Sequence, residues 1–245
     1  RTAHIRDVGG SNPSSATIVM IKNLLSVIIC VYNEEKTVEK LINKVQASKL
    51  PKKFSKEIII IDNCSTDQTR NILKKFLNNK NYIIRLQDKN YGKGNSIIEG
   101  LKISKGEYIV FQDADLEYDP NNYLFLLNEA IKKNLDAVLG SRSLHDPNYH
   151  IYRLNSFGTK YFTRLINFLY KSSFTDTSTN HKLVKSEVLK KLELKSKGFE
   201  LDFEIALKLA KKNYKYAEIP ISFYPRTKKD GKKLKIIDGF KCLKV

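Results

Sequence analysis

The stretch Glu57-Ile58-Ile59-Ile60-Ile61 decides the fold class of this 245-residue chain. Its four consecutive isoleucines form a run of strand length, and a run without polar alternation is typical of a strand buried on both faces of a parallel sheet. A second apolar run, residues 24–31, comes before it, and apolar residues recur at helical spacing between the two runs, from Val38 to Val45. The sequence therefore predicts a strand, a helix and a parallel strand in succession.

Apolar runs of strand length continue to alternate with helical stripes along the chain. The predicted strands are residues 24–31, 57–61, 82–86, 107–111, 135–139 and 217–223. The predicted helices are residues 38–45, 72–77, 95–104, 123–133, 157–170 and 202–211. Because alternating strands and helices imply βαβ units, we expect an α/β fold with a mostly parallel central sheet and helices on both faces, in a single domain.

Residues 1–19 differ from the rest of the chain. They contain no lysine, include the run Gly9-Gly10-Ser11-Asn12-Pro13, and precede Met20, the single methionine. They also lack the apolar stretch of a signal peptide. We expect residues 1–19 to be a non-native or disordered extension and residues 20–245 to be the folded domain.

The chain carries a formal net charge of +18, mostly from lysine. This balance favours anionic partners such as nucleotide diphosphates, lipid phosphates or membrane surfaces, although a solvated lysine-rich surface explains the charge equally well. No run approaches the roughly eighteen apolar residues of a membrane-spanning helix, so any membrane contact is expected to be peripheral. The three cysteines have no metal-binding or disulfide spacing, which suits the reducing cytoplasm.

Acidic residues cluster directly after the fourth predicted strand, in the run Phe111-Gln112-Asp113-Ala114-Asp115-Leu116-Glu117. Asp113 and Asp115 are two positions apart at a strand end and can reach one divalent ion, with Glu117 as a third oxygen donor. Hard oxygen ligands suit Mg²⁺ or Mn²⁺, which keep positions open for phosphate oxygens. The alternative is an acidic turn before the next helix, since Asp119-Pro120 has the form of a helix N-terminus. One turn can serve both purposes.

Two earlier strand ends also carry acids. Glu34 follows the first strand in Val31-Tyr32-Asn33-Glu34-Glu35, and Asp62 follows the second in Ile61-Asp62-Asn63-Cys64-Ser65. A carboxylate there can accept a hydrogen bond from a nucleobase N–H, and Tyr32 can stack on the base, although each segment alone also has the form of a helix start. Ligands of parallel sheets bind at the carboxyl ends of strands. The glycines of Asn90-Tyr91-Gly92-Lys93-Gly94 would let a phosphate approach the backbone at the same edge.

These four segments together resemble the family 2 glycosyltransferases with the GT-A fold, whose motifs read VYNEE, VDDGSTDGT, NxGKG and DADLQxxP. The resemblance runs from about residue 24 to about residue 240. The second half is similar to the branch that contains the polyprenyl-phosphate sugar synthases, such as dolichyl-phosphate mannosyltransferase. The stretches that carry this likeness are residues 139–142, 176–182, 198–204, 218–221 and 224–227.

The resemblance implies a role for each matching position. Nucleoside contacts are implied for Tyr32, Glu34 and Asp62, and a Mg²⁺ or Mn²⁺ site at the donor diphosphate for Asp113, Asp115 and Glu117. The implied phosphate ligands are Lys93, Arg142, Lys182 and Arg226, and Asp202 and Glu204 are placed near the acceptor. The candidate catalytic residues are Asp115, Asp202, Arg142 and Arg226. Two departures stand out: Asn63-Cys64 replaces an acid and a glycine, and Asn180-His181 replaces a glycine and an aromatic residue, which puts the acceptor in question.

The implied function is an inverting transfer of a hexose from a nucleotide-diphosphate sugar, of the GDP-mannose or UDP-glucose type, to a polyprenyl or dolichyl phosphate. Residues 20–245 would then be the catalytic domain. An alternative acceptor is a hydroxyl of a cell-surface polysaccharide or glycolipid, which needs a general base such as Asp202. A non-enzymatic basic module leaves the acids at three strand ends unexplained, and no nucleic-acid-binding motif is present. We expect a cytoplasmic enzyme without a nucleic-acid partner, at the membrane face if the helix at residues 157–170 lies in the interface and not in the core.

Overall fold

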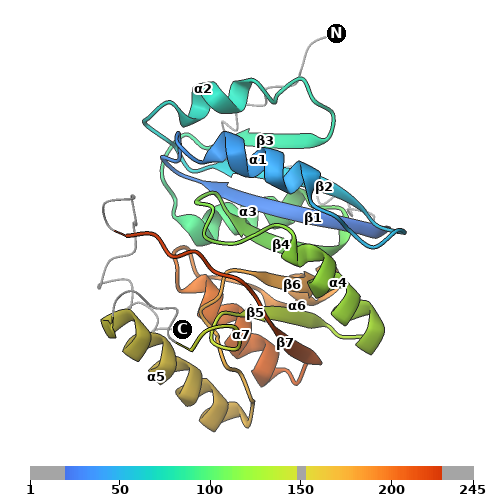
Figure 1. Cartoon of the computed structure of the whole chain (residues 1–245), viewed down its shortest axis with the longest axis vertical. Helices are drawn as coiled ribbons and strands as arrows, with labels where there is room; N and C mark the ends of the chain where they lie inside the picture. Colours follow the sequence, from blue (N-terminus) through green and yellow to red (C-terminus); the bar gives the residue numbers. More distant parts are fainter. Residues whose placement is uncertain (1–19, 148–152, 228–245) are drawn as a thin grey trace.

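A computed structural model describes residues 20–147 and 153–227, with no side chains described for residues 153–157. The predicted extension, residues 1–19, lies outside the described residues. One seven-stranded sheet, with the strand order β3-β2-β1-β4-β6-β5-β7, forms the centre of the fold (Figure 1). The strands are β1 (Ile21–Val31), β2 (Ser55–Asp62), β3 (Tyr82–Leu86), β4 (Gly106–Asp113), β5 (Ala137–Ser141), β6 (Lys182–Lys185) and β7 (Tyr216–Pro220).

The sheet is mostly parallel, as predicted. β1 pairs in parallel with β2 and with β4, and β2 pairs in parallel with β3. β6 is antiparallel to both β4 and β5, whereas β5 and β7 are parallel to each other. The carboxyl ends of β1, β2 and β4 therefore lie at the same edge of the sheet.

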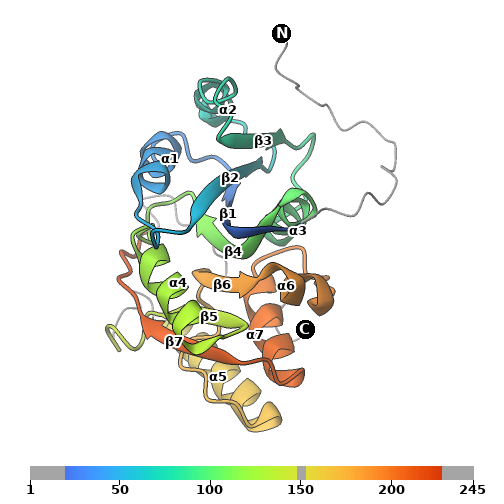
Figure 2. The ribbon, with the colours of Figure 1, turned by 90° about the vertical axis from the view of Figure 1, so that its right-hand side faces the viewer.

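Helices cover both faces of the sheet, as Figure 2 shows. One face packs against α1 (Val38–Ala47), α2 (Thr69–Lys74) and α4 (Asn122–Lys133). The other face packs against α3 (Lys93–Ile103), α6 (Ser186–Leu192) and α7 (Leu201–Lys211). The remaining helix, α5 (Arg153–Tyr170), lies beside α7 at the outside of the molecule.

The isoleucine run of β2 shows why this sequence forms a doubly covered strand. Ile58 and Ile60 contribute to the core on the α1 side, and Ile59 and Ile61 contribute to the core on the α3 side. All four are buried. Burial of each such side chain contributes about 1.5–3 kcal/mol, so both faces of the strand need apolar residues. The absence of polar alternation in the sequence follows from this geometry.

The sequence pattern does not predict β6 and α6. β6 has only four residues, too few to show a period, and its extended form depends on pairing with β4 and β5. Two predicted strands are also shifted. The strand expected at residues 135–139 starts at Ala137, after Asn134 ends α4 in a left-handed conformation. The strand expected at residues 217–223 ends at Pro220, which pairs with Ser141, the last residue of β5. Within the described residues no helix is long and apolar enough to span a membrane.

Candidate active site

Three neighbouring strands bring acidic residues to one edge of the sheet. In the strand register, Cys30 of β1 pairs with Ile61 of β2 on one side and with Asp113 of β4 on the other. Asp62 and Asp113, the last residues of β2 and β4, thus flank the end of β1. Glu34 follows the end of β1 by three positions. The backbone therefore gathers these acids at the edge where parallel sheets bind ligands.

Arg226 joins three carboxylates at this edge. Its Nη1 and Nη2 donate to the two oxygens of Glu34 at 3.1 and 3.2 Å, and Nη2 also donates to Oδ2 of Asp115 at 2.9 Å. Its backbone N–H donates to Oε1 of Glu117 at 2.7 Å. Burial alone would lower the pKa of Arg226, but the charges of Asp115 and Glu34 outweigh it and raise that pKa. The acids from β1 and β4 are thus bridged by a cation from the C-terminal segment.

Asp115 has a pKa raised to about 7. Burial is the main cause, and the negative charges of Asp113 and Glu117 add to it, while Arg226 offsets part of the effect. Close carboxylates that repel one another favour a bound divalent ion, and their hard oxygens suit Mg²⁺ or Mn²⁺. Among the described residues no three Asp, Glu, His or Cys side chains are arranged to hold a metal alone. An ion here would therefore take some of its ligands from the carboxylates and the others from phosphate oxygens, as Mg²⁺ commonly does.

A second group of charges centres on Lys93 at the start of α3. Its Nζ lies 2.9 Å from Oδ1 of Asp113 and 3.5 Å from Oδ2 of Asp202. Lys182 is fully buried; its Nζ donates to the carbonyl of Thr179 and lies 3.7 Å from Oδ1 of Asp202. Burial lowers the pKa of Lys182 to about 8 although Asp202 acts against it. For Lys93 burial also acts to lower the pKa, but Asp113 and Asp202 raise it.

A glycine positions Lys93. Gly92 has a φ of 94°, in the left-handed region, and a Cβ at this position would collide with the carbonyl of Lys197. The N–H of Asn95 donates to the same carbonyl at 3.2 Å. This close backbone contact holds the start of α3 against the loop before α7, and so keeps Lys93 beside Asp202.

Asp62 is completely buried at the end of β2. Its Oδ2 accepts hydrogen bonds from Nε of Arg70 at 2.7 Å and from the N–H of Ser65 at 3.2 Å. Its Oδ1 has no hydrogen-bond partner among the described residues. A buried carboxylate oxygen without a donor is unusual, and the N–H of a bound base would satisfy it. The half-buried Tyr32 lies just beyond the end of β1, the strand that pairs with β2.

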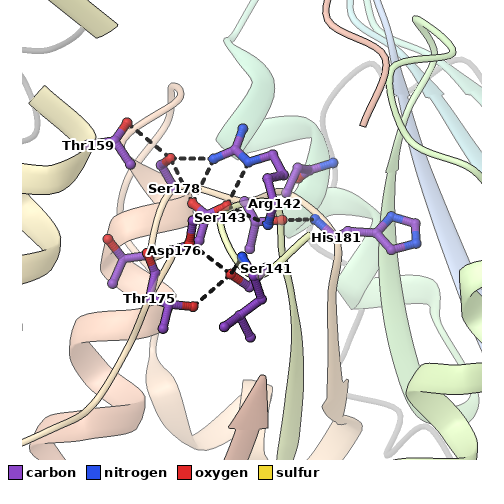
Figure 3. Close-up of polar contacts among 12 residues, drawn as sticks. Ser141, Arg142, Ser143, Thr159, Thr175, Asp176, Ser178 and His181 are labelled. Atoms are coloured by element: carbon purple, nitrogen blue, oxygen red, sulfur yellow. Dashed lines mark hydrogen bonds and ion pairs between the residues drawn. The ribbon is translucent and has the colours of Figure 1, made fainter. Parts of the chain in front are cut away.

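Arg142 lies in a separate network, shown in Figure 3. Asp176 accepts hydrogen bonds from Nε and Nη2 of Arg142, each at 2.7 Å, and from its backbone N–H at 3.1 Å. Nη2 also donates to Oγ of Ser178 at 2.6 Å. Burial acts to raise the pKa of Asp176, but Arg142 lowers it. Asp176 is therefore a fixed anion that orients the guanidinium, which lies 5.1 Å from the ring centre of Phe223.

Glu204 contacts the loop before α7. Its carboxylate accepts hydrogen bonds from the N–H groups of Lys195 at 3.0 Å and Ser196 at 2.8 Å, and it lies 2.6 Å from Nζ of Lys208. Burial acts to raise the pKa of Glu204, but these hydrogen bonds, first that of Lys208, lower it. This geometry is that of a residue that holds a loop, and a role of Glu204 in substrate binding stays a prediction.

Comparison with known proteins assigns the arrangement to a family. The model described as Glycosyl transferase family 2 matches residues 26–193, more than half of the chain. The chain belongs to glycosyl transferase family 2. An uncharacterized protein of Methanocaldococcus jannaschii is 30% identical over 206 residues, which cover 80% of this chain and 86% of that protein.

Two relatives of this family 2 chain carry functional names. The dolichol-phosphate mannosyltransferase of Pyrococcus furiosus is 29% identical over 85% of this chain and 58% of its own length. The dodecaprenyl-phosphate galacturonate synthase of Rhizobium johnstonii is 24% identical over 69% of this chain and 50% of its own length. The chain thus spans only about half of the length of these two proteins. Both names confirm the predicted likeness to the polyprenyl-phosphate sugar synthase branch.

Solved structures confirm the GT-A fold of the family 2 chain. Glucosyl-3-phosphoglycerate synthase from Mycobacterium tuberculosis, in complex with Mn²⁺, UDP and phosphoglyceric acid, superposes with a TM-score of 0.64 at 17% identity, covering 85% of this chain and 73% of that chain. S. aureus TarS 1–349 superposes with a TM-score of 0.59 at 22% identity, covering 89% of this chain and 69% of that chain. At such identities the likeness concerns the fold alone.

Two partner residues in this family 2 site were not predicted. Arg70 pairs with Asp62, and Asp176 holds Arg142 from 34 positions away. Arg70 is an ordinary charged residue near the start of a helix, and nothing in the local sequence indicates its partner. Asp176 begins a stretch that matches the family branch, so that match was the available signal. The predicted residues themselves fall into separate groups, around Arg226, around Lys93, at Asp62, at Arg142 and at Glu204.

Proposed function

We propose that this chain is the catalytic part of an inverting glycosyltransferase, which moves a hexose from a nucleotide-diphosphate sugar to a polyprenyl phosphate at the cytoplasmic face of a membrane. The observation that carries the proposal is the meeting of Glu34, Asp115 and Glu117 around Arg226 at the carboxyl edge of the sheet. A diphosphate with a divalent cation needs acidic and basic groups together at one place. The names of the two curated relatives support a lipid-phosphate acceptor.

On the donor side, Oδ1 of Asp62, which has no hydrogen-bond partner among the described residues, would accept an N–H of the base while Tyr32 packs against its ring. Asp113 and Asp115, with Glu117 and oxygens of the donor diphosphate, would hold Mg²⁺ or Mn²⁺, an ion that neutralises charge on a departing diphosphate. The M. tuberculosis neighbour was crystallised with Mn²⁺ and UDP, which supports a donor of this kind. We propose a donor of the GDP-mannose or UDP-glucose type.

In the transfer, an acceptor oxygen attacks the anomeric carbon while the bond from that carbon to the diphosphate oxygen breaks, so the configuration inverts. Lys93 and Arg226 are the cations that can stabilise the negative charge growing on the leaving diphosphate. A lipid phosphate is already an anion and needs no general base. Arg142, held in place by Asp176, would bind that phosphate and position it.

One observation favours a hydroxyl acceptor instead. Oδ1 of Asp202 accepts no hydrogen bond from the described residues, and a carboxylate oxygen in this state can take a proton from a sugar hydroxyl. Against this role, Lys93 and Lys182 lie 3.5 and 3.7 Å from the same carboxylate and tie it into an ion cluster. In the alternative, the product would be a cell-surface polysaccharide or a glycolipid.

The test uses the full chain, Mn²⁺, labelled nucleotide sugars, and either polyprenyl phosphate or soluble glycans as acceptor. We expect a labelled lipid, and we expect Asp115→Asn to abolish both transfer and donor hydrolysis. Asp119→Asn in the same loop is the matched control, because Oδ1 of asparagine can still accept the hydrogen bond that the N–H of Asn121 donates to Asp119. Label on a soluble glycan with none on lipid would replace the first acceptor by the second. Full activity of Asp115→Asn would remove the proposed site.

A further inference from the structure

One side of α5 exposes large apolar side chains among basic ones. Phe168 is 82% exposed, Tyr161 is 59% exposed and Leu169 is 56% exposed. Lys160 and Arg164 are exposed beside them. The positions 160, 161, 164 and 168 follow the spacing of one helix face. Large apolar side chains gathered on a surface with charged neighbours mark an interaction surface.

The opposite side of α5 packs on the protein. Thr163 and Ile166 are buried, and the ring of Phe162 lies 5.3 Å from that of Phe203 in α7. Figures 1 and 2 both place α5 at the outside of the molecule, beside α7. The side that carries Phe168 is therefore left uncovered by the described part of the chain.

The charge of α5 indicates what kind of partner fits this side. The helix has 18 residues and none is Asp or Glu, while Lys160 and Arg164 lie on the exposed side and Lys171 follows directly. A helix with aromatic and basic residues on one face fits the interface of a membrane that contains anionic phospholipid. Nucleic acid would satisfy the charges but would leave Phe168 and Leu169 in water.

We propose that the exposed side of α5 docks the protein on an anionic bilayer surface and thereby places Arg142 at the level of the lipid headgroups. The inner side of the helix reaches the Arg142 network directly. Oγ1 of Thr159 lies 3.3 Å from Oγ of Ser178, which accepts a hydrogen bond from Arg142 (Figure 3). One helix thus contacts the membrane on one side and the phosphate-binding arginine on the other. The purpose of this contact rests on the proposed function, since a polyprenyl phosphate displays its phosphate at that depth.

The test is sedimentation of the full chain, without donor or acceptor, with phosphatidylcholine vesicles that contain or lack phosphatidylglycerol. The wild type should bind the anionic vesicles. The double variant Phe168→Ser with Leu169→Ser should bind at least about tenfold more weakly, because it loses two apolar anchors. Arg164→Glu should also weaken binding by at least about fivefold, since each basic residue near an anionic surface contributes about fivefold and the new carboxylate is repelled.

The matched controls lie on α4. Phe125→Ser removes an apolar side chain that is 59% exposed, and Lys132→Glu changes the net charge as Arg164→Glu does. Both controls should bind vesicles like the wild type. All variants change exposed side chains, so their melting temperatures and their stabilisation by nucleotide with Mn²⁺ should be unchanged. Equal binding of the α5 variants and the controls would overturn the proposal, and so would a wild type that does not sediment with anionic vesicles.

Other occupants of the surface give different results. A dimer in solution that dissociates in the double variant would assign this side of α5 to a second copy and overturn membrane docking. Vesicle binding that depends on α5, without any labelled lipid product, would leave the docking proposal standing and remove the proposed acceptor. Glycosylation of polyprenyl phosphate in detergent, without vesicle binding, would support the proposed acceptor and overturn membrane docking.

Discussion

Replacement of His181 by phenylalanine is expected to make the fold less sensitive to acid. His181 is completely buried between Tyr118 and Tyr123, with ring centroids 5.4 and 5.5 Å away and nearly parallel ring planes. Neither ring nitrogen of His181 has a hydrogen-bond partner among the described residues. A phenylalanine ring fills similar space without burying two unpaired nitrogens. His181→Phe should therefore be at least as stable as the wild type at neutral pH.

The acid sensitivity follows from the pKa of His181. Burial lowers this pKa from 6.5 to about 4, although Asp113 and Asp119 act in the opposite direction. Between these values the unfolded chain binds a proton that the folded protein does not, so the free energy of unfolding falls as the pH falls. The whole shift corresponds to about 3 kcal/mol. The free energy of unfolding falls by about 2 kcal/mol of this amount between about pH 7 and about pH 5.

The assay is urea unfolding of the wild type and of His181→Phe at several pH values. The difference in unfolding free energy should widen in favour of the variant by about 2 kcal/mol from about pH 7 to about pH 5. His145→Phe replaces an exposed histidine and serves as the control, with a pH profile parallel to that of the wild type. A profile of His181→Phe parallel to that of the wild type would refute the reasoning.

Three further substitutions test the candidate active site and the glycine at the start of α3. Arg226→Gln should strengthen Mn²⁺ binding roughly several-fold, because the guanidinium no longer competes for Asp115, and weaker binding in a melting-temperature titration would contradict this. Asp176→Asn removes the counter-charge that orients Arg142, so steady-state kinetics should show the acceptor KM raised at least about tenfold with the donor KM nearly unchanged; an unchanged acceptor KM would count against it. Gly92→Ala should lower the unfolding free energy by at least about 1 kcal/mol, since φ is 94°; an unshifted urea midpoint would show that the backbone can relax.

The parallel half of the sheet could be predicted because both of its faces are covered. A strand such as β2 must then be apolar throughout, and the sequence shows this directly. Strand β6 could not be predicted in the same way. β6 begins and ends with lysine, and Lys182 is completely buried because it turns its ammonium group toward Asp202 and the carbonyl of Thr179. A buried charge gives no apolar signal, so only tertiary contacts reveal that strand.

The site was predictable in position but not in its pairings. Acids that follow strands of a parallel sheet meet at one edge, and Asp62 and Asp113 do so because β1 lies between their strands. Which cation meets which acid depends on side chains far apart in sequence. Arg226 reaches Glu34 and Asp115 across 192 and 111 positions, and no local pattern contains that information.

The charge of the Arg226 cluster links the stability of the fold to the proposed chemistry. When Glu34, Asp115 and Glu117 are all ionised they carry a charge of −3, and Arg226 supplies +1, so −3 + 1 = −2 remains. Burial, together with the charges of Asp113 and Glu117, raises the pKa of Asp115 to about 7 even with Arg226 as a partner. The remaining charge is equal and opposite to that of one divalent cation. The same arginine that bridges the ends of β1 and β4 therefore leaves the fully ionised cluster with a charge that one bound Mg²⁺ or Mn²⁺ would balance.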